Sequence, residues 1–204
     1  MQDDEAPRRR GRPKSLDRER LIDIAMRAYW EAGPQGVSVN ALCQMAGISK
    51  PSLYREFGGE DGLMRAALEA YAASVLGRVV ALLDGPGSFA ERLDAMASFF
   101  AEDPVFAHGC LFTKLRAAQP LAGVDTRALV VAIEADTRAA FAAFLQSARD
   151  GGDWAGCVPV ALGARYLDAQ FGLALASRAA GVPVAEVRAV LDLALSVFVA
   201  RAAS

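Results

Sequence analysis

Apolar residues recur every three or four positions along most of this chain, which is the spacing of one buried face on an α-helix. The first such run covers residues 21–32, and two short runs follow at 38–46 and 49–57. Ser38 and Ser49 stand at the start of the two short runs. A serine hydroxyl at that position accepts a hydrogen bond from the free N–H groups of the first helical turn. The pattern predicts three short helices before residue 58.

Longer apolar runs with the same spacing continue to the C-terminus. Gly85-Pro86-Gly87 separates the first of them from the next, which opens with the capping-box spacing of Ser88 and Glu91. No run alternates apolar and polar residues between turns, so we expect no β-strand. The sequence predicts an all-α protein of about nine helices, the later ones at about residues 60–82, 88–101, 110–118, 125–149, 159–180 and 183–204.

The second and third predicted helices are separated by Ala46-Gly47-Ile48-Ser49, which is the spacing of a helix-turn-helix. The outer face of the third helix would then be free to enter the major groove of DNA. A generic helical hairpin has the same spacing and is the alternative. The packing that we expect between the two helices joins five apolar residues: Ala41, Leu42 and Met45 with Leu53 and Phe57.

Charge is distributed unevenly along the chain. The formal net charge is −2, but residues 6–57 contain ten basic and five acidic residues. A basic end on an acidic body indicates one surface for a polyanion and another surface for a different partner. Because 53% of the residues are hydrophobic, the chain has ample material for a core.

Residues 33–57 resemble the DNA-binding domain of the TetR/AcrR family of bacterial transcription repressors. The predicted number and lengths of the later helices agree with the nine-helix form of that family. We therefore divide the chain into a flexible basic arm (1–14), a helix-turn-helix DNA-binding domain (15–62) and an effector-binding and dimerisation domain (63–204). The matching residues are Ser38-Val39-Asn40-Ala41-Leu42, Ala46-Gly47-Ile48-Ser49-Lys50, Ser52-Leu53-Tyr54-Arg55-Glu56-Phe57 and Leu63.

The resemblance implies which side chains contact DNA. Tyr54 and Ser38 would donate their hydroxyls to phosphates, in agreement with the chemistry of phosphate oxygens. Lysine and arginine on the third helix can reach O6 and N7 of guanine. The residues implied on this recognition helix are Lys50, Pro51, Ser52, Tyr54 and Arg55.

The chain departs from the family pattern at two acidic positions. Glu56 stands where the family often has an aromatic residue or histidine, and Glu60 stands where it often has lysine. One or two of the family's phosphate contacts are therefore in doubt for this chain.

The arginine-rich arm is a further candidate for DNA contact, through Arg10 and Arg12. Arg-Gly-Arg-Pro at residues 10–13 resembles the core of an AT-hook, in which arginines enter a narrow minor groove. The alternative is a disordered basic tail that adds only non-specific attraction.

We expect no enzyme and no cofactor. The chain has no nucleophile elbow, phosphate-binding loop or zinc-protease motif, and its one histidine, His108, offers little for a metal site. The three cysteines are widely spaced and indicate reduced thiols in a cytoplasmic protein. Cys110 is a candidate sensor thiol, with a structural cysteine as the alternative. We expect neither a secretory signal nor a membrane-spanning helix.

The C-terminal domain has too many apolar residues for a single buried stripe per helix. Aromatic residues there either line an effector pocket or simply fill the core. The candidate pocket residues are Phe99, Phe112, Phe141, Phe144, Tyr166 and Gln170, and the candidate dimer interface on the last two helices is Leu173, Ala176, Leu191, Leu195 and Phe198.

These observations predict a homodimeric transcriptional repressor that binds a palindromic operator in double-stranded DNA and is released by a small, largely apolar effector. An activator, or a DNA-binding regulator without a ligand, is one alternative. A module whose basic end binds another polyanion is a second alternative.

Overall fold

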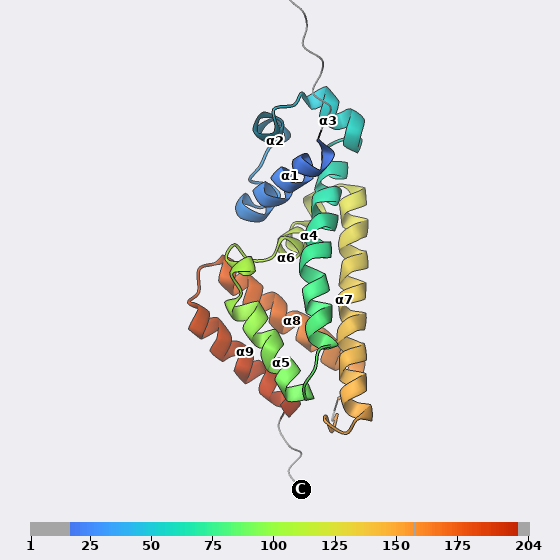
Figure 1. The fold of residues 1–204 in the computed structure, drawn as a ribbon, viewed down its shortest axis with the longest axis vertical. Helices are drawn as coiled ribbons and strands as arrows, with labels where there is room; N and C mark the ends of the chain where they lie inside the picture. Colours follow the sequence, from blue (N-terminus) through green and yellow to red (C-terminus); the bar gives the residue numbers. More distant parts are fainter. Residues whose placement is uncertain (1–16, 157, 200–204) are drawn as a thin grey trace, which may run out of the picture.

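The computed structural model describes residues 17–156 and 158–199, which form nine α-helices and two short 3₁₀ turns without a strand (Figure 1). The all-α architecture is therefore confirmed. The predicted arm with Arg10 and Arg12 lies outside the described residues. The helices are α1 (Arg18–Ala32), α2 (Val39–Ala46), α3 (Lys50–Phe57), α4 (Glu60–Leu83), α5 (Phe89–Glu102), α6 (Leu111–Ala117), α7 (Val124–Asp150), α8 (Val160–Ala179) and α9 (Val184–Val199), with turns η1 (Pro104–Phe106) and η2 (Gln119–Leu121).

Four helices begin with a capping side chain. Asp17, Ser38, Ser49 and Ser88 each accept a hydrogen bond from the backbone N–H three residues further along. At α5 the contact is reciprocal, because the carboxylate of Glu91 accepts from the N–H of Ser88 at 2.7 Å. These bonds satisfy N–H groups that the first turn of a helix leaves free.

Two long helices, α4 and α7, run side by side and connect the two ends of the molecule (Figure 1). The short helices α1, α2 and α3 form one end, where α1 packs against α4. At the other end α8 packs against α7 and α9, and α5 packs against α9. The short helix α6 contacts α1, α4, α7 and α8, so it touches both groups of helices.

Among the described residues, α4 is the one helix long and apolar enough to cross a membrane. One face of α4 is nevertheless buried within the chain, where the helix packs on α1 and α7. The buried residues are Leu63, Ala66, Ala67, Leu68, Tyr71, Val75, Val79 and Leu83. This is the packing of a core helix. Only the length and the apolar composition of α4 are like those of a membrane-spanning helix.

The start of α4 is fastened to the start of α7. The carboxylate of Asp61 accepts hydrogen bonds from the N–H of Asp125 (2.9 Å), the N–H of Thr126 (3.2 Å) and the hydroxyl of Thr126 (2.5 Å). Thr126 is completely buried. This contact fixes the helix that follows α3 to the frame of the C-terminal helices.

The buried face of α2 differs from our expectation. Val39, Leu42 and Cys43 are buried, whereas Met45 is 55% exposed and Ala41 is half-buried. The expected packing of Met45 against the third helix is therefore wrong. Because α2 has only eight residues, its apolar pattern does not fix how the helix is rotated about its axis.

Candidate nucleic-acid interface and internal cavity

The turn between α2 and α3 has helix-turn-helix geometry. Gly47 ends α2 with a φ of 67°, a left-handed conformation that glycine adopts easily because it has no Cβ. Ser49 caps α3 two residues later. Leu42 and Leu53 are completely buried, so the two helices pack through these faces and the opposite face of α3 is left to solvent.

That exposed face carries most of the residues predicted to contact DNA. Ser38 is also exposed, at the N-terminus of α2. Ser52 is half-buried, and its hydroxyl lies 2.9 Å from the hydroxyl of Ser49. The predicted DNA-contact residues that are exposed on α3 are Lys50, Pro51, Tyr54 and Arg55.

Glu60, at the start of α4, lies against this face. The Tyr54 hydroxyl donates to its carboxylate at 3.3 Å, and the Lys50 ammonium lies 3.9 Å from the same oxygen. Sequence analysis had marked Glu60 as a departure from the family pattern, but it did not predict these contacts. The carboxylate thus holds two of the groups that are predicted to contact DNA, Tyr54 and Lys50.

Glu56, the second unusual acid, is directed elsewhere. Its carboxylate lies 3.4 Å from the Nε of Arg18, and the Arg18 guanidinium lies over the Phe57 ring, 5.2 Å from its centroid. Glu56 therefore ties α3 to α1, and its charge is balanced by a neighbouring arginine.

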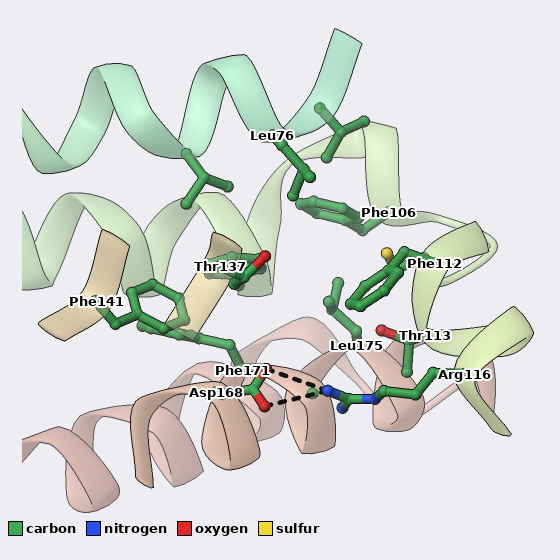
Figure 2. A pocket seen from close by; sticks show the side chains of 15 residues that line it. Leu76, Phe106, Phe112, Thr113, Arg116, Thr137, Phe141, Asp168, Phe171 and Leu175 are labelled. Atoms are coloured by element: carbon green, nitrogen blue, oxygen red, sulfur yellow. Dashed lines mark hydrogen bonds and ion pairs between the residues drawn. The ribbon is translucent and has the colours of Figure 1, made fainter. Parts of the chain in front are cut away.

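A cavity of about 40 Å³ lies among the C-terminal helices, between α4, α5, α6, α7 and α8 (Figure 2). Its lining is mostly apolar. Two of the predicted pocket residues, Phe112 and Phe141, line it. Phe100 and Phe171, two further aromatic residues of these helices, also line it. The apolar lining residues that were not predicted from the sequence are Val75, Leu76, Val79, Phe106, Cys110 and Leu175.

The other four predicted pocket residues do not line this cavity, so the six do not share one pocket. Phe99 lies beneath the guanidinium of Arg78, and Phe144 packs against a phenylalanine of α5. Tyr166 donates its hydroxyl to a carbonyl of α9 at 3.1 Å, and Gln170 lines a groove between α8 and α9. Apolar spacing predicts that such residues are buried, but it does not predict which layer they join.

One side of the cavity is polar. The Nη1 atom of Arg116 donates to both carboxylate oxygens of Asp168, at 3.1 and 3.2 Å. Arg138 and Glu134 extend the cluster, since Arg138 pairs with both Glu134 and Asp168. Figure 2 shows the Arg116–Asp168 pair beside Thr113 at the edge of the aromatic lining.

Helix α6 connects this cavity to the N-terminal helices. The indole N–H of Trp30, in α1, donates to the carbonyl of Gly109 at 2.8 Å, just before α6. The Lys114 ammonium, in α6, donates to the carbonyl of Trp30, and burial lowers the pKa of this lysine. Phe112, Thr113 and Arg116 of the same helix line the cavity. One short helix therefore contacts both α1 and the cavity.

Comparisons with known proteins agree with this geometry. A family model described as "Bacterial regulatory proteins, tetR family" matches residues 21–67. A solved structure described as the TetR family transcriptional regulator CifR, a cysteine mutant complexed with 26-bp double-strand operator DNA, is 25% identical with a TM-score of 0.77. That match covers 92% of this chain and 100% of the other. Residues 21–67 therefore match the tetR family of bacterial regulatory proteins, and the chain shares the fold of a TetR family regulator over most of its length.

Two curated TetR-like relatives match shorter regions. The HTH-type transcriptional repressor ComR of Escherichia coli is 42% identical over 62 residues, which is 30% of each chain. The uncharacterized HTH-type transcriptional regulator YezE of Bacillus subtilis is 30% identical over 106 residues, or 49% of this chain and 53% of the other. This chain thus spans about half or less of the curated relatives that it matches. The family model that matches residues 21–67 describes regulatory proteins, which agrees with the expectation that the chain is no enzyme.

The predicted dimer residues fall into two groups. Leu173 and Ala176 of α8 are exposed. Leu191, Leu195 and Phe198 of α9 are buried inside the chain, with exposures of 2%, 5% and 3%, so their assignment to a contact surface is wrong. Because α9 is apolar on nearly every side, its sequence does not distinguish the two faces. The exposed large apolar residues on α8 and α9 are instead Leu162, Leu173, Val184, Val190, Leu193, Val197 and Val199.

Proposed function

We propose that this chain is a homodimeric transcriptional repressor that binds a palindromic operator through α3 and leaves it when a small, largely apolar effector binds. The observation that carries the proposal is the exposed face of α3, which presents Lys50, Tyr54 and Arg55 on a packed helix-turn-helix. We place the protein in the cytoplasm, where an operator is accessible.

Each exposed group has a chemistry suited to one part of DNA. Lys50 and Arg55 can donate to O6 and N7 of guanine in the major groove. Tyr54 and Ser38 can donate hydroxyls to phosphates, and the N-terminus of α2 adds free N–H groups. Arg10 and Arg12 of the arm (1–14) would add contacts to the minor groove or to phosphates.

The exposed apolar stripes of α8 and α9 support dimerisation through the domain of residues 63–204. Leu162 and Leu173 are more than half exposed on α8, as are Leu193 and Val197 on α9. Two such helices from each subunit would form a four-helix bundle around a two-fold axis. That symmetry matches the two half-sites of a palindrome, each bound by one domain of residues 15–62.

The contacts of α6 support a route for effector release. A molecule that enters the cavity displaces α6 side chains, and α6 is hydrogen-bonded to α1 through Trp30 and Lys114. Movement of α1 and of the start of α4 would change the distance between the two recognition helices. Effector and operator would then each weaken the binding of the other by the same factor.

The relatives support the same conclusion. ComR is named a transcriptional repressor, and CifR was solved on operator DNA. The experiment is an electrophoretic mobility shift with the DNA upstream of the chain's own gene. We expect a shifted band that survives excess non-specific competitor, while retention of equal strength by any polyanion would contradict the proposal.

A further inference from the structure

The cavity contains a hydroxyl group without a hydrogen bond. Thr137 Oγ1 of α7 is buried and has no partner among the residues that the structure describes. The residue lines the cavity, and Figure 2 shows its oxygen on the cavity side. Buried polar groups normally have partners, because leaving one unpaired costs free energy. The hydroxyl is therefore available to a ligand.

A second group on the cavity wall has N–H donors to spare. Both hydrogen bonds that the structure gives the Arg116 guanidinium come from Nη1 and go to Asp168. The Nη2 atom lies across the backbone of α8 at Gly172, where an added Cβ would come within 2.9 Å of it. Because Gly172 has no side chain, the Nη2 atom of Arg116 can lie close to the backbone of α8, beside the cavity.

The acceptors at this side are already occupied. The carboxylate of Asp168 accepts two hydrogen bonds from Arg116 and lies 3.4 Å from the Nε of Arg138. Glu134 pairs with Arg138. Two arginines and two carboxylates cancel in charge, so the cluster provides no net attraction for an ion. The groups that can still form hydrogen bonds are donors, the Thr137 hydroxyl and Arg116 Nη2, and they match a neutral acceptor on the ligand.

We propose that the cavity binds a small, mostly apolar molecule with one neutral carbonyl group, such as a ketone, aldehyde, ester or lactone. The Thr137 hydroxyl donates to the carbonyl oxygen, and Arg116 Nη2 provides a second donor. The apolar remainder lies against Phe112, Phe141 and Phe171. This inference rests on the proposed function and specifies its effector.

The size of the cavity links this ligand to the regulatory contacts. A volume of about 40 Å³ holds only a few water molecules. A ring of six carbons therefore enlarges the cavity when it binds. The side chains of α6 form one wall, so enlargement of the cavity displaces α6. Lys114 of this helix donates to the carbonyl of Trp30 in α1, and the displacement therefore reaches α1.

The test is calorimetric titration of the full chain with three matched probes: cyclohexanone, methylcyclohexane and cyclohexanecarboxylate. We expect cyclohexanone to bind about tenfold more tightly than methylcyclohexane, and cyclohexanecarboxylate to bind most weakly of the three. A tenfold difference corresponds to about 1.4 kcal/mol, the upper range of one neutral hydrogen bond.

Two threonine variants locate the effect. Thr137→Val removes the hydroxyl with little change of shape, so it should abolish the preference for cyclohexanone and leave the melting temperature of the free protein equal or higher. Thr113→Val is the matched control, because its hydroxyl lines the same cavity and is not the buried, unpaired one. We expect this control to change the preference less than twofold.

The proposal is overturned if wild-type protein binds ketone and hydrocarbon equally, binds the carboxylate more tightly, or does not bind the ketone. It is also overturned if Thr137→Val keeps the ketone preference. Operator binding by the ligand-free protein, measured in parallel, separates the two claims. Its absence contradicts the proposed function, whereas equal probe affinities with intact operator binding contradict only the ligand class.

Discussion

At the scale of single residues, Glu60 is the side chain that most changes the account of DNA binding. Its carboxylate contacts both Tyr54 and Lys50, on the face that we propose binds DNA. A negative charge at this place repels phosphates, and Tyr54 and Lys50 must leave the carboxylate before they can contact DNA. We therefore expect Glu60 to lower the affinity for an operator below what the donors of α3 would give without it.

We expect Glu60→Gln to strengthen operator binding about threefold to tenfold, because it removes a repulsive charge and frees two donors. Fluorescence anisotropy with labelled operator measures the change. Glu69→Gln is the matched control, since it removes the same charge from an exposed i,i+4 pair with Arg65 further along α4. Weaker or unchanged binding by Glu60→Gln, relative to this control, would show that Glu60 does not oppose DNA contact.

At the scale of helices, local signals predicted the elements well. Ser38, Ser49 and Ser88 cap helices where the sequence indicates, and Gly47 forms the turn of the helix-turn-helix. These features depend on residues within one turn of each other, so they can be inferred without tertiary structure.

The faces of the helices were harder to predict. Met45 is exposed because two turns of apolar residues fit several rotations of α2, and Leu195 is buried because α9 offers apolar residues on both sides. The contact of Glu60 with Tyr54 and the unpaired hydroxyl of Thr137 depend on where whole helices meet. Such contacts have no signature in the spacing of residues along the chain.

Helix α6 packs against four other helices, and its link to α1 can be tested without a ligand. Trp30→Phe keeps an aromatic ring but removes the indole hydrogen bond to the carbonyl of Gly109. Loss of about 1 kcal/mol should raise local opening roughly fivefold. We expect amide hydrogens of α6 to exchange about that much faster, as measured by mass spectrometry, and those of α9 to exchange at the wild-type rate. Equal rates in α6 would mean that the bond does not restrain this helix.

At the scale of the whole molecule, the central expectation is a two-fold dimer through α8 and α9. Leu193 is 75% exposed, whereas Leu195, two positions away, is 5% exposed and lies in the core. Substitutions at these two leucines therefore test different properties: Leu193 tests contact with a partner subunit, and Leu195 tests the stability of the single chain.

We expect Leu193→Glu to give monomers that keep their helicity, because the charge is placed on the outer surface of each chain, with a melting temperature lowered only by the lost association. Leu195→Glu should lose several kcal/mol of unfolding free energy, because it buries an unpaired carboxylate. Sedimentation velocity and circular dichroism measure the two effects. A wild-type monomer at micromolar concentration, or a Leu193→Glu dimer, would contradict the assignment of the interface.

The most direct measurement is the affinity of wild-type protein, Arg55→Ala and Arg65→Ala for the same operator at one salt concentration. Arg55 is exposed on α3, whereas Arg65 pairs with Glu69 on α4 at 2.9 Å, so the two variants remove equal charge from different places. The account predicts that Arg55→Ala weakens binding by about 1–3 kcal/mol and relaxes the base preference at one position in each half-site. It predicts a change of less than about twofold for Arg65→Ala, as for an exposed ion pair of low energy. Equal affinity and equal base preference for wild type and Arg55→Ala would contradict the claim that α3 reads the operator.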